Sequence, residues 1–369
     1  MSNKKHDVYF DFGSSKIRAS AIDKNDHTDN FYCESNFYLN QLNIEQELQK
    51  IINSLEKHTK EYLNEISLMV DSQKMLSIGI SISKKIDGLR LKKEDIQFLI
   101  QDSKQQIISN YNSMNIIHII IKNYKIDETD YTSLPEDANC DLLSLDLIFI
   151  CLPKRNIDYI QKLFSKFDVS VNQIFCSSYA KAFNYKNNFS TTNKISFIDI
   201  GLDKTSVTCF KNDMINFFQI IPIGSHHITK DLSKVLDIDL ENAEKIKLDI
   251  VNNNINNYDH PLDLIKKIIH ERLDEILKLS LNSIKFKDDF DELNNDKIIF
   301  MGDGSKIINL ETNKQILSLK SYNIMGEDTK SICQGILGLS KGINKQEVVV
   351  VPKKQIKMGF FEKLFHFFR

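Results

Sequence analysis

Two stretches with the same construction decide the fold: VYFDFGSSKIRASAID at residues 8–23 and ISFIDIGLDKTSVTCF at residues 195–210. In each, an apolar strand ends at an aspartate, a turn that contains a glycine follows, and an alternating strand leaves the turn. Both copies fit D-[FI]-G-x-x-K-x-x-x-[ST], which pairs Asp11 with Asp199, Gly13 with Gly201, Lys16 with Lys204 and Ser20 with Thr208. The repeat predicts two related domains that face each other with a ligand between the hairpins, although single strand–turn–strand units are common.

The residue types of the repeat suit an anionic ligand that carries a divalent metal. Backbone N–H groups in a tight turn of glycine and serine can point together and bind an anion. An aspartate beside such a turn suits Mg²⁺, which proteins commonly hold through water molecules. A nucleoside triphosphate with its metal ion combines both requirements.

Two further motifs lie in the second half of the chain. In KIIFMGDGSKIINL, at residues 297–310, a buried strand breaks at Gly302, Asp303, Gly304 and Ser305, and a helix is expected to follow. Glycines there would let the backbone approach a flat or anionic ligand, although an ordinary strand-to-helix turn has the same pattern. In ENAEKIKLDI, at residues 241–250, Glu244 and Lys247 share one helix face, which in isolation indicates a solvated ion pair.

The composition excludes several classes of protein. The 369 residues suit about two to four domains, and a formal net charge of −2 argues against a nucleic-acid partner. The N-terminal residues lack the apolar core of a signal peptide, and the apolar runs are too short to cross a bilayer. Six cysteines without a C-x-x-C pair favour reduced thiols in a cytoplasm, and nine histidines show no metal-ligand spacing.

A compact α/β unit of its own is predicted between the first hairpin region and the middle of the chain, at about residues 76–167. LSIGISI predicts a strand, KKEDIQFLIQDSKQQII a helix, NIIHIIIKNYKID and LDLIFICLP two buried strands, and NIDYIQKLFSKF a second helix. A purely structural insertion is the plain alternative to a partner-binding unit.

The last residues, GFFEKLFHFFR at 359–369, predict an amphipathic helix. Five phenylalanines and one leucine fall on one face, and every charged residue falls on the other. A polar, basic linker precedes this stretch, so we expect an interfacial membrane anchor. A helix docked on the protein's own core and a helix that binds a calmodulin-like groove are the alternatives. The predicted membrane-binding residues are Phe360, Phe361, Lys363, Leu364, Phe365, Phe367, Phe368 and Arg369.

The order of these motifs resembles the actin-like ATPase superfamily and, within it, the FtsA family of bacterial cell division. The matching stretches are DFGSSKIRA, QIFCSSYAKAF, FIDIGLDKTSVTCF, IPIGSHHITKDL, AEKIK, IFMGDGSKI and the GFFEKLFHFF tail. The resemblance implies an α/β, two-lobed actin-like (ribonuclease H-like) ATPase fold with an inserted α/β subdomain and a C-terminal amphipathic helix.

The resemblance also implies domain boundaries. The first lobe would comprise residues 1–75 and 168–190, interrupted by the inserted subdomain at 76–167, which in this family contacts the polymer and other division proteins. The second lobe would span 191–332, with a subdomain insertion at about 237–296. A return helix at 333–343, a linker at 344–357 and the membrane-targeting helix at 358–369 would follow.

The resemblance further implies a site for ATP and Mg²⁺. Asp11, Gly13, Ser14, Ser15 and Lys16 would form the first phosphate turn, and Asp199 and Gly201 the second, with both aspartates holding Mg²⁺ through water. Gly224 would lie in a turn before a helix, Glu244 and Lys247 would meet the ribose and adenine, and Gly302, Gly304 and Ser305 would lie on the adenosine side. The family's second turn usually reads D-x-G-G-G-T, whereas Leu202 and Asp203 stand here, so at most weak ATPase activity is expected.

The function implied is a membrane-tethered scaffold at the division site, on the cytoplasmic face of the inner membrane. Its partners would be filaments of the tubulin-like FtsZ, further copies of the chain, other division proteins and anionic lipid. A pilus-assembly relative of FtsA and a sugar or acetate kinase of the same superfamily are the alternatives. The tail counts against both, and no aspartate-containing substrate motif supports a kinase.

Overall fold

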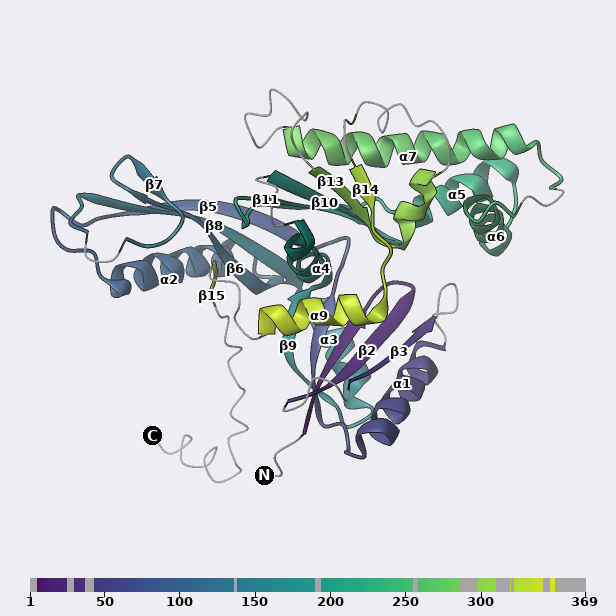
Figure 1. Cartoon of the computed structure of the whole chain (residues 1–369), viewed down its shortest axis with the longest axis horizontal. Helices are drawn as coiled ribbons and strands as arrows, with labels where there is room; N and C mark the ends of the chain where they lie inside the picture. Colours follow the sequence, from purple (N-terminus) through teal and green to yellow (C-terminus); the bar gives the residue numbers. More distant parts are fainter. Residues whose placement is uncertain are drawn as a thin grey trace.

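The computed structural model describes residues 5–24, 30–36, 43–135, 138–189, 194–254, 258–285, 297–309, 319, 322–340 and 346–348. These residues form three five-stranded sheets, which Figure 1 shows in separate parts of the molecule. We call the parts built on the first and second sheets lobe 1 and lobe 2, and the third the inserted sheet.

Lobe 1 contains the first hairpin of the repeat. Its strands are β1 (His6–Phe12), β2 (Lys16–Asp23), β3 (Phe31–Asn36), β4 (Glu65–Val70) and β9 (Ser170–Cys176), in the order β3-β2-β1-β4-β9. Helices α1 (Ile44–Thr59) and α3 (Lys154–Ser165) cover one face, since Phe31 stacks on His58 of α1 and Phe10 packs edge-on against Phe164 of α3. Tyr9, which points to the opposite face, contacts Ser340 of α9 (Thr329–Ser340).

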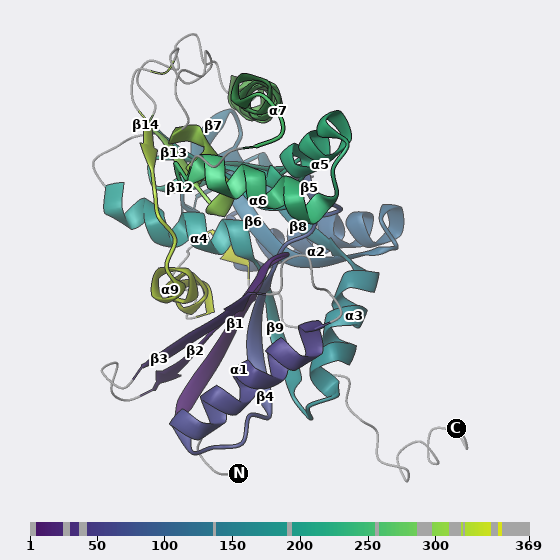
Figure 2. The ribbon, with the colours of Figure 1, turned by 90° about the vertical axis from the view of Figure 1, so that its right-hand side faces the viewer.

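Lobe 2 repeats this arrangement with the second hairpin. Its strands are β10 (Lys194–Ile200), β11 (Thr205–Lys211), β12 (Met214–Ile221), β13 (Lys297–Met301) and β14 (Tyr322–Ile324), in the order β12-β11-β10-β13-β14. In both lobes the two strands of the hairpin are antiparallel. The first of them pairs on its other side with a parallel strand, β4 in lobe 1 and β13 in lobe 2. Helices α5 (Ser225–Leu236), α6 (Leu240–Val251) and α7 (Leu262–Lys285) pack on this sheet (Figures 1 and 2). The two related α/β units predicted from the repeat are therefore confirmed.

Two helices join the lobes. Helix α4 (Ser177–Lys186) follows the last strand of lobe 1, and α9 follows the last strand of lobe 2. They lie side by side in both views, between the two lobes. A Cβ at Gly335 of α9 would lie 2.6 Å from the carbonyl oxygen of Ala180, so only a glycine permits this close crossing.

The inserted sheet has the three predicted strands, β5 (Leu76–Lys85), β6 (Met114–Ile126) and β8 (Leu142–Pro153), and the predicted helix α2 (Lys93–Asn110), in the predicted order. The short strand β7 (Thr129–Tyr131) was not predicted. The second helix predicted for this unit, α3, follows β8 but packs on lobe 1. The sheet order is β15-β6-β8-β5, with β7 paired to β6. Figure 1 shows this unit extending to one side of the two lobes, with its own core beneath α2.

The segment predicted as a linker begins differently. Glu347 and Val348 form the short strand β15, which pairs antiparallel with β6. The buried side chain of Gln346 accepts from Ile215 N–H at 2.8 Å in lobe 2 and donates to Ile121 O at 3.0 Å in the inserted sheet. A polar glutamine suggests a solvated linker, but here its amide satisfies backbone groups of two sheets. The predicted tail helix at 358–369 lies outside the described residues.

No helix within the described ranges is long and apolar enough to cross a membrane. The turn after β13 continues into the 3₁₀ helix η4 (Asp303–Asn309), shorter than the helix expected there.

Candidate functional site: the cleft between the lobes

The glycine turns of the two hairpins have the same backbone geometry. Gly13 N–H donates to Lys16 O at 3.0 Å, and Gly201 N–H donates to Lys204 O at 2.9 Å. A cavity of about 90 Å³ lies between the turns. Of the residues predicted to bind nucleotide, eight line it: Asp11, Gly13, Ser14, Ser15, Lys16, Asp199, Gly201 and Gly302.

The other predicted residues lie outside this lining, among them Gly224, Gly304 and Ser305. A Cβ at Gly224 would come within 2.5 Å of Leu202 O, and one at Gly304 within 2.7 Å of Ile200 O. The close backbone approach that the glycines predict is therefore made by the second hairpin itself. The Ser305 hydroxyl donates to Gly302 O at 2.7 Å and closes its own turn.

The N-terminus of α5 is also engaged by the second hairpin. Ser225 N–H donates to Gly201 O at 2.9 Å, and His226 N–H donates to Leu202 O at 2.8 Å. Unpaired N–H groups make a helix N-terminus an anion-binding site. These two are satisfied by backbone carbonyls, so α5 does not offer them to a phosphate.

Glu244 and Lys247 form a buried pair on α6 rather than the solvated pair that isolated spacing indicates. Lys247 Nζ lies 2.7 Å from the Glu244 carboxylate and donates to Thr229 Oγ1 at 2.9 Å, while the Thr229 hydroxyl donates to Glu244. Burial lowers the pKa of Lys247, although Glu244 acts against the shift. The pair joins α6 to α5, and the predicted contacts with ribose and adenine stay a prediction.

A cluster of buried ion pairs occupies the cleft, built largely from residues that sequence patterns did not single out. Lys181 of α4 places its Nζ 2.7 Å from Asp199 Oδ2 and 2.8 Å from Glu327 Oε1. Burial would lower the pKa of Lys181, but the two carboxylates outweigh it and hold the pKa well above its usual value. Arg18 lies 3.0 Å from Asp11 and 3.6 Å from Glu327.

The aspartates predicted to hold Mg²⁺ already have protein partners. Asp11 pairs with Arg18 and accepts from Ser177 Oγ at 2.7 Å. Asp199 pairs with Lys181, and its Oδ1, which has no hydrogen-bond partner in the described part of the chain, lies against the backbone of Gly302. A cation next to each carboxylate opposes the binding of a second cation there.

The cleft as a whole does not fit a magnesium nucleotide. About 90 Å³ is available, against about 300–1,000 Å³ for typical small-molecule sites. The lining carries six carboxylates and four cations: Asp11, Asp71, Asp199, Asp203, Asp303 and Glu327, with Lys16, Arg18, Lys181 and Lys204. An added triphosphate would meet an excess of negative charge.

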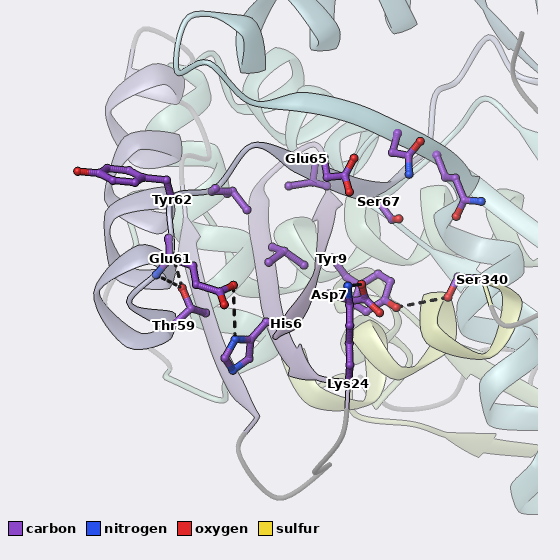
Figure 3. Close-up of a pocket in the computed structure, with 15 residues that line it drawn as sticks. His6, Asp7, Tyr9, Lys24, Thr59, Glu61, Tyr62, Glu65, Ser67 and Ser340 are labelled. Atoms are coloured by element: carbon purple, nitrogen blue, oxygen red, sulfur yellow. Dashed lines mark hydrogen bonds and ion pairs between the residues drawn. The ribbon is translucent and has the colours of Figure 1, made fainter. Parts of the chain in front are cut away.

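A larger cavity of about 250 Å³ lies at the far end of lobe 1, where β1 begins (Figure 3). Figure 3 shows His6 and Glu61 on its wall, with a ring nitrogen of His6 3.9 Å from a carboxylate oxygen of Glu61. Neither nitrogen of the His6 ring, which is buried, has a hydrogen-bond partner among the described residues. Sequence patterns gave no signal for this hollow, because its lining comes from five separate segments.

The comparisons with known proteins agree with the resemblance drawn from the motifs. Residues 196–319 match the family model described as "Cell division protein FtsA". FtsA of Buchnera aphidicola subsp. Acyrthosiphon pisum is 24% identical over 352 residues, which cover 83% of this chain and 83% of that protein. FtsA of Agrobacterium fabrum is 21% identical over 270 residues, which cover 68% of this chain and 60% of that protein.

Solved structures show the fold. The PilM-PilN type IV pilus biogenesis complex matches with a TM-score of 0.64 at 11% identity, over 92% of this chain and 99% of that chain. The ethanolamine utilization protein EutJ from Carboxydothermus hydrogenoformans matches with a TM-score of 0.51 at 11% identity, over 90% of this chain and 88% of that chain. Identities this low carry the architecture and nothing about ligands. The chain is thus similar in sequence to the FtsA cell-division proteins, and it has the actin-like ATPase fold that its motifs predict.

Proposed function

We propose that this chain is a cell-division scaffold that anchors FtsZ filaments to the cytoplasmic face of the inner membrane at the division site. It polymerises on that surface and recruits later division proteins. The observation that carries this proposal is the sequence similarity to FtsA over 83% of the chain.

We assign the membrane contact to the predicted helix at residues 358–369, from its sequence alone. Its six large apolar side chains would contribute about 1.5–3 kcal/mol each if fully buried. Ordering the backbone costs about 1–2 kcal/mol per residue, so one tail binds a lipid surface weakly and reversibly. Lys353, Lys354, Lys357 and Lys363 add attraction to anionic lipid. Many tails on one polymer bind firmly, because each bound tail raises the effective concentration of the next.

The inserted sheet is the unit we assign to partner binding. It has its own core and its own helix, and β5 is the last strand of its sheet among the described residues, with contacts to β12 of lobe 2. An α/β unit that projects from the two lobes presents a surface to other proteins without disturbing the cleft (Figure 1).

The proposed role contains no nucleotide step. ATP and Mg²⁺ follow from the resemblance, yet the aspartates assigned to the metal and the lysine of the first turn are paired with other side chains. Weak ATPase activity at most was expected, and scaffolding requires none.

The alternatives have less support. The likeness to the pilus complex is one of fold, whereas the sequence similarity is to cell-division proteins. A kinase needs a free catalytic base beside a substrate pocket. The carboxylates of Asp11, Asp199 and Asp303 that line this cleft pair with its lysines and arginine.

Sedimentation with liposomes tests the proposal. The full chain should sediment with vesicles that contain anionic lipid and should bring FtsZ filaments with it. A chain without residues 358–369 should leave the vesicles but still bind FtsZ. Phe365→Asp, on the apolar face, should act like the deletion, whereas Glu362→Gln on the polar face should not. FtsZ that stays in the supernatant while the full chain binds vesicles would refute the anchoring role.

A further inference from the structure

We propose that the two lobes are clasped across the cleft by the protein's own charged side chains, which take the place of a magnesium nucleotide. The chain would therefore hold its closed form without ATP. We call the contacts of Lys16, Arg18, Lys181 and Lys204 with the facing carboxylates the interlobe clasp. The inference does not depend on the membrane or FtsZ contacts proposed above.

The first part of the clasp is the turn of the second hairpin. Lys204, which is buried, places its Nζ 2.8 Å from Asp71 Oδ2, just after β4 in lobe 1. It also donates to Ser178 Oγ of α4 at 2.6 Å. Burial would lower the pKa of Lys204, but Asp71 and Asp199 outweigh it and raise the pKa above its usual value. The lysine is therefore charged at neutral pH, and the neighbouring carboxylates of lobe 1 and β10 already balance its charge.

The same turn bonds lobe 1 through its backbone. Gln73 Nε2 donates to Asp203 O at 2.6 Å. Leu202 and Asp203 stand where the FtsA family usually has glycines, and their side chains limit the approach of a phosphate to the turn. In this chain the turn contacts Gln73 and Asp71 of lobe 1 at the place where those glycines would face a phosphate.

The second part of the clasp is the turn of the first hairpin. Lys16, predicted to face phosphates, reaches lobe 2 and lies 2.8 Å from Asp303 Oδ2. Arg18 approaches the same oxygen at 3.5 Å. Burial would raise the pKa of Asp303, but hydrogen bonds from Lys16 and Lys306 lower it to about 2. Each hairpin thus sends a lysine across the cleft to a carboxylate of the other lobe.

The third part lies deepest, where Lys181 links Asp199 of β10 to Glu327, directly ahead of α9. Glu327 also faces Arg18 of β2. This cation therefore bonds lobe 2 to the segment that returns toward lobe 1. A triphosphate would have to break several of these pairs and leave carboxylates in an enclosed site without a cation, which strongly disfavours its binding.

Nucleotide titration tests the first half of the inference. With the full chain, Mg²⁺ and a fluorescent ATP analogue, we expect no saturable binding tighter than a Kd of about 1 mM. Calorimetry with unmodified MgATP should agree. Saturable binding tighter than that limit, by either method, would overturn the proposal.

Hydrogen exchange tests the clasp itself. In the nucleotide-free chain, amides at residues 71–75 and 201–205 should exchange slowly, and MgATP should not change them. Lys204→Met should speed exchange in both segments together, by about tenfold or more, because the opening of the lobes exposes both. Lys306→Met is the matched control, since Lys306 pairs with Asp303 at 3.0 Å within η4, and its ion pair in the described part of the chain lies inside lobe 2.

A second variant guards against misfolding of the first. Lys16 is more exposed than Lys204, so Lys16→Asp should fold and open the cleft, and Lys16→Asp with Asp303→Lys should restore slow exchange. Unchanged exchange in Lys16→Asp, or protection of the wild-type segments by MgATP, would show that these pairs do not hold the lobes.

Discussion

Lys181→Met removes a buried cation that pairs with two carboxylates in the cleft, while keeping a long apolar side chain. The side chain of Lys181 is 8% exposed, and those of Asp199 and Glu327 are each 3% exposed. At an effective dielectric constant of about 20, an ion pair at about 4 Å contributes about 4 kcal/mol, and two pairs offset the desolvation of the lysine. Methionine would take the closest cation away from both buried carboxylates, and Glu327 would keep only a longer contact with Arg18, at 3.6 Å, among the described residues. We expect the free energy of unfolding to fall by about 3–5 kcal/mol.

Urea unfolding at neutral pH, followed by circular dichroism, measures this loss. Lys306→Met is the control, because its exposed pair with Asp303 should be worth less than about 1 kcal/mol. Adding Glu327→Gln to Lys181→Met should recover part of the loss, since it removes a buried charge that has lost its closest cation.

The pH dependence gives a second test of the same reasoning. Burial acts to raise the pKa of Asp199, but Lys181 and Lys204 outweigh it and lower the pKa. A lowered carboxyl pKa stabilises the fold above the unfolded pKa, and this stability is lost as pH falls through the folded value. The deficit of Lys181→Met should therefore shrink on acidification. A loss below about 1 kcal/mol, or a deficit that does not change with pH, would refute an electrostatic role for the lysine.

Three further changes have expected outcomes. Gly335→Ala should destabilise the crossing of α4 and α9, whereas Gly338→Ala on the same helix, whose Cβ would have no neighbour nearer than 3.6 Å, should be neutral or stabilising in thermal unfolding. Gly302→Ala should lower stability by about 1–3 kcal/mol, because φ is +86° and the new Cβ would lie 2.5 Å from Ile200 O, whereas Gly79→Ala meets nothing within 4 Å. Asp303→Asn should lower stability at neutral pH, and its difference from wild type in urea titrations should disappear as pH falls from about 4 toward 2, because the native pKa of Asp303 is about 2 and the ordinary value is 3.8.

Local signals in the sequence were sufficient for the two hairpins and their duplication, but not for β7, β15 or the short η4. Strand alternation, a glycine turn and an aspartate at the strand end define each hairpin within sixteen residues, and the register pairs Asp11 with Arg18 and Asp199 with Ser206 in the same way. The strands and helices of the inserted sheet were likewise set by short apolar patterns.

The pairing of side chains in the cleft could not be predicted in the same way. Four of the residues that pair in the cleft come from four separate segments, which lie together only in the folded protein: Arg18, Asp71, Lys181 and Glu327. Two weak signals existed in the sequence: Arg18 stands between isoleucine and alanine in a strand, and Lys181 stands among alanine, tyrosine and phenylalanine residues in a helix. A charged residue in an enclosed position requires a partner, but sequence alone does not say which.

Glycine motifs proved ambiguous for a related physical reason. A glycine marks a place where something approaches the backbone closely, and the sequence does not say whether that is a ligand or the protein itself. At Gly224, Gly302 and Gly304 the approaching group is the second hairpin. These contacts fix the turn that carries Asp203 and Lys204. The same turn contacts Gln73 and Asp71 of lobe 1. The glycines that suggested a nucleotide thus support the contacts that replace it.

A subunit whose closed form is set by its own side chains would keep one shape through each round of assembly. In the membrane-bound polymer proposed above, assembly would then depend on the local concentration of chains and partners and not on a bound nucleotide.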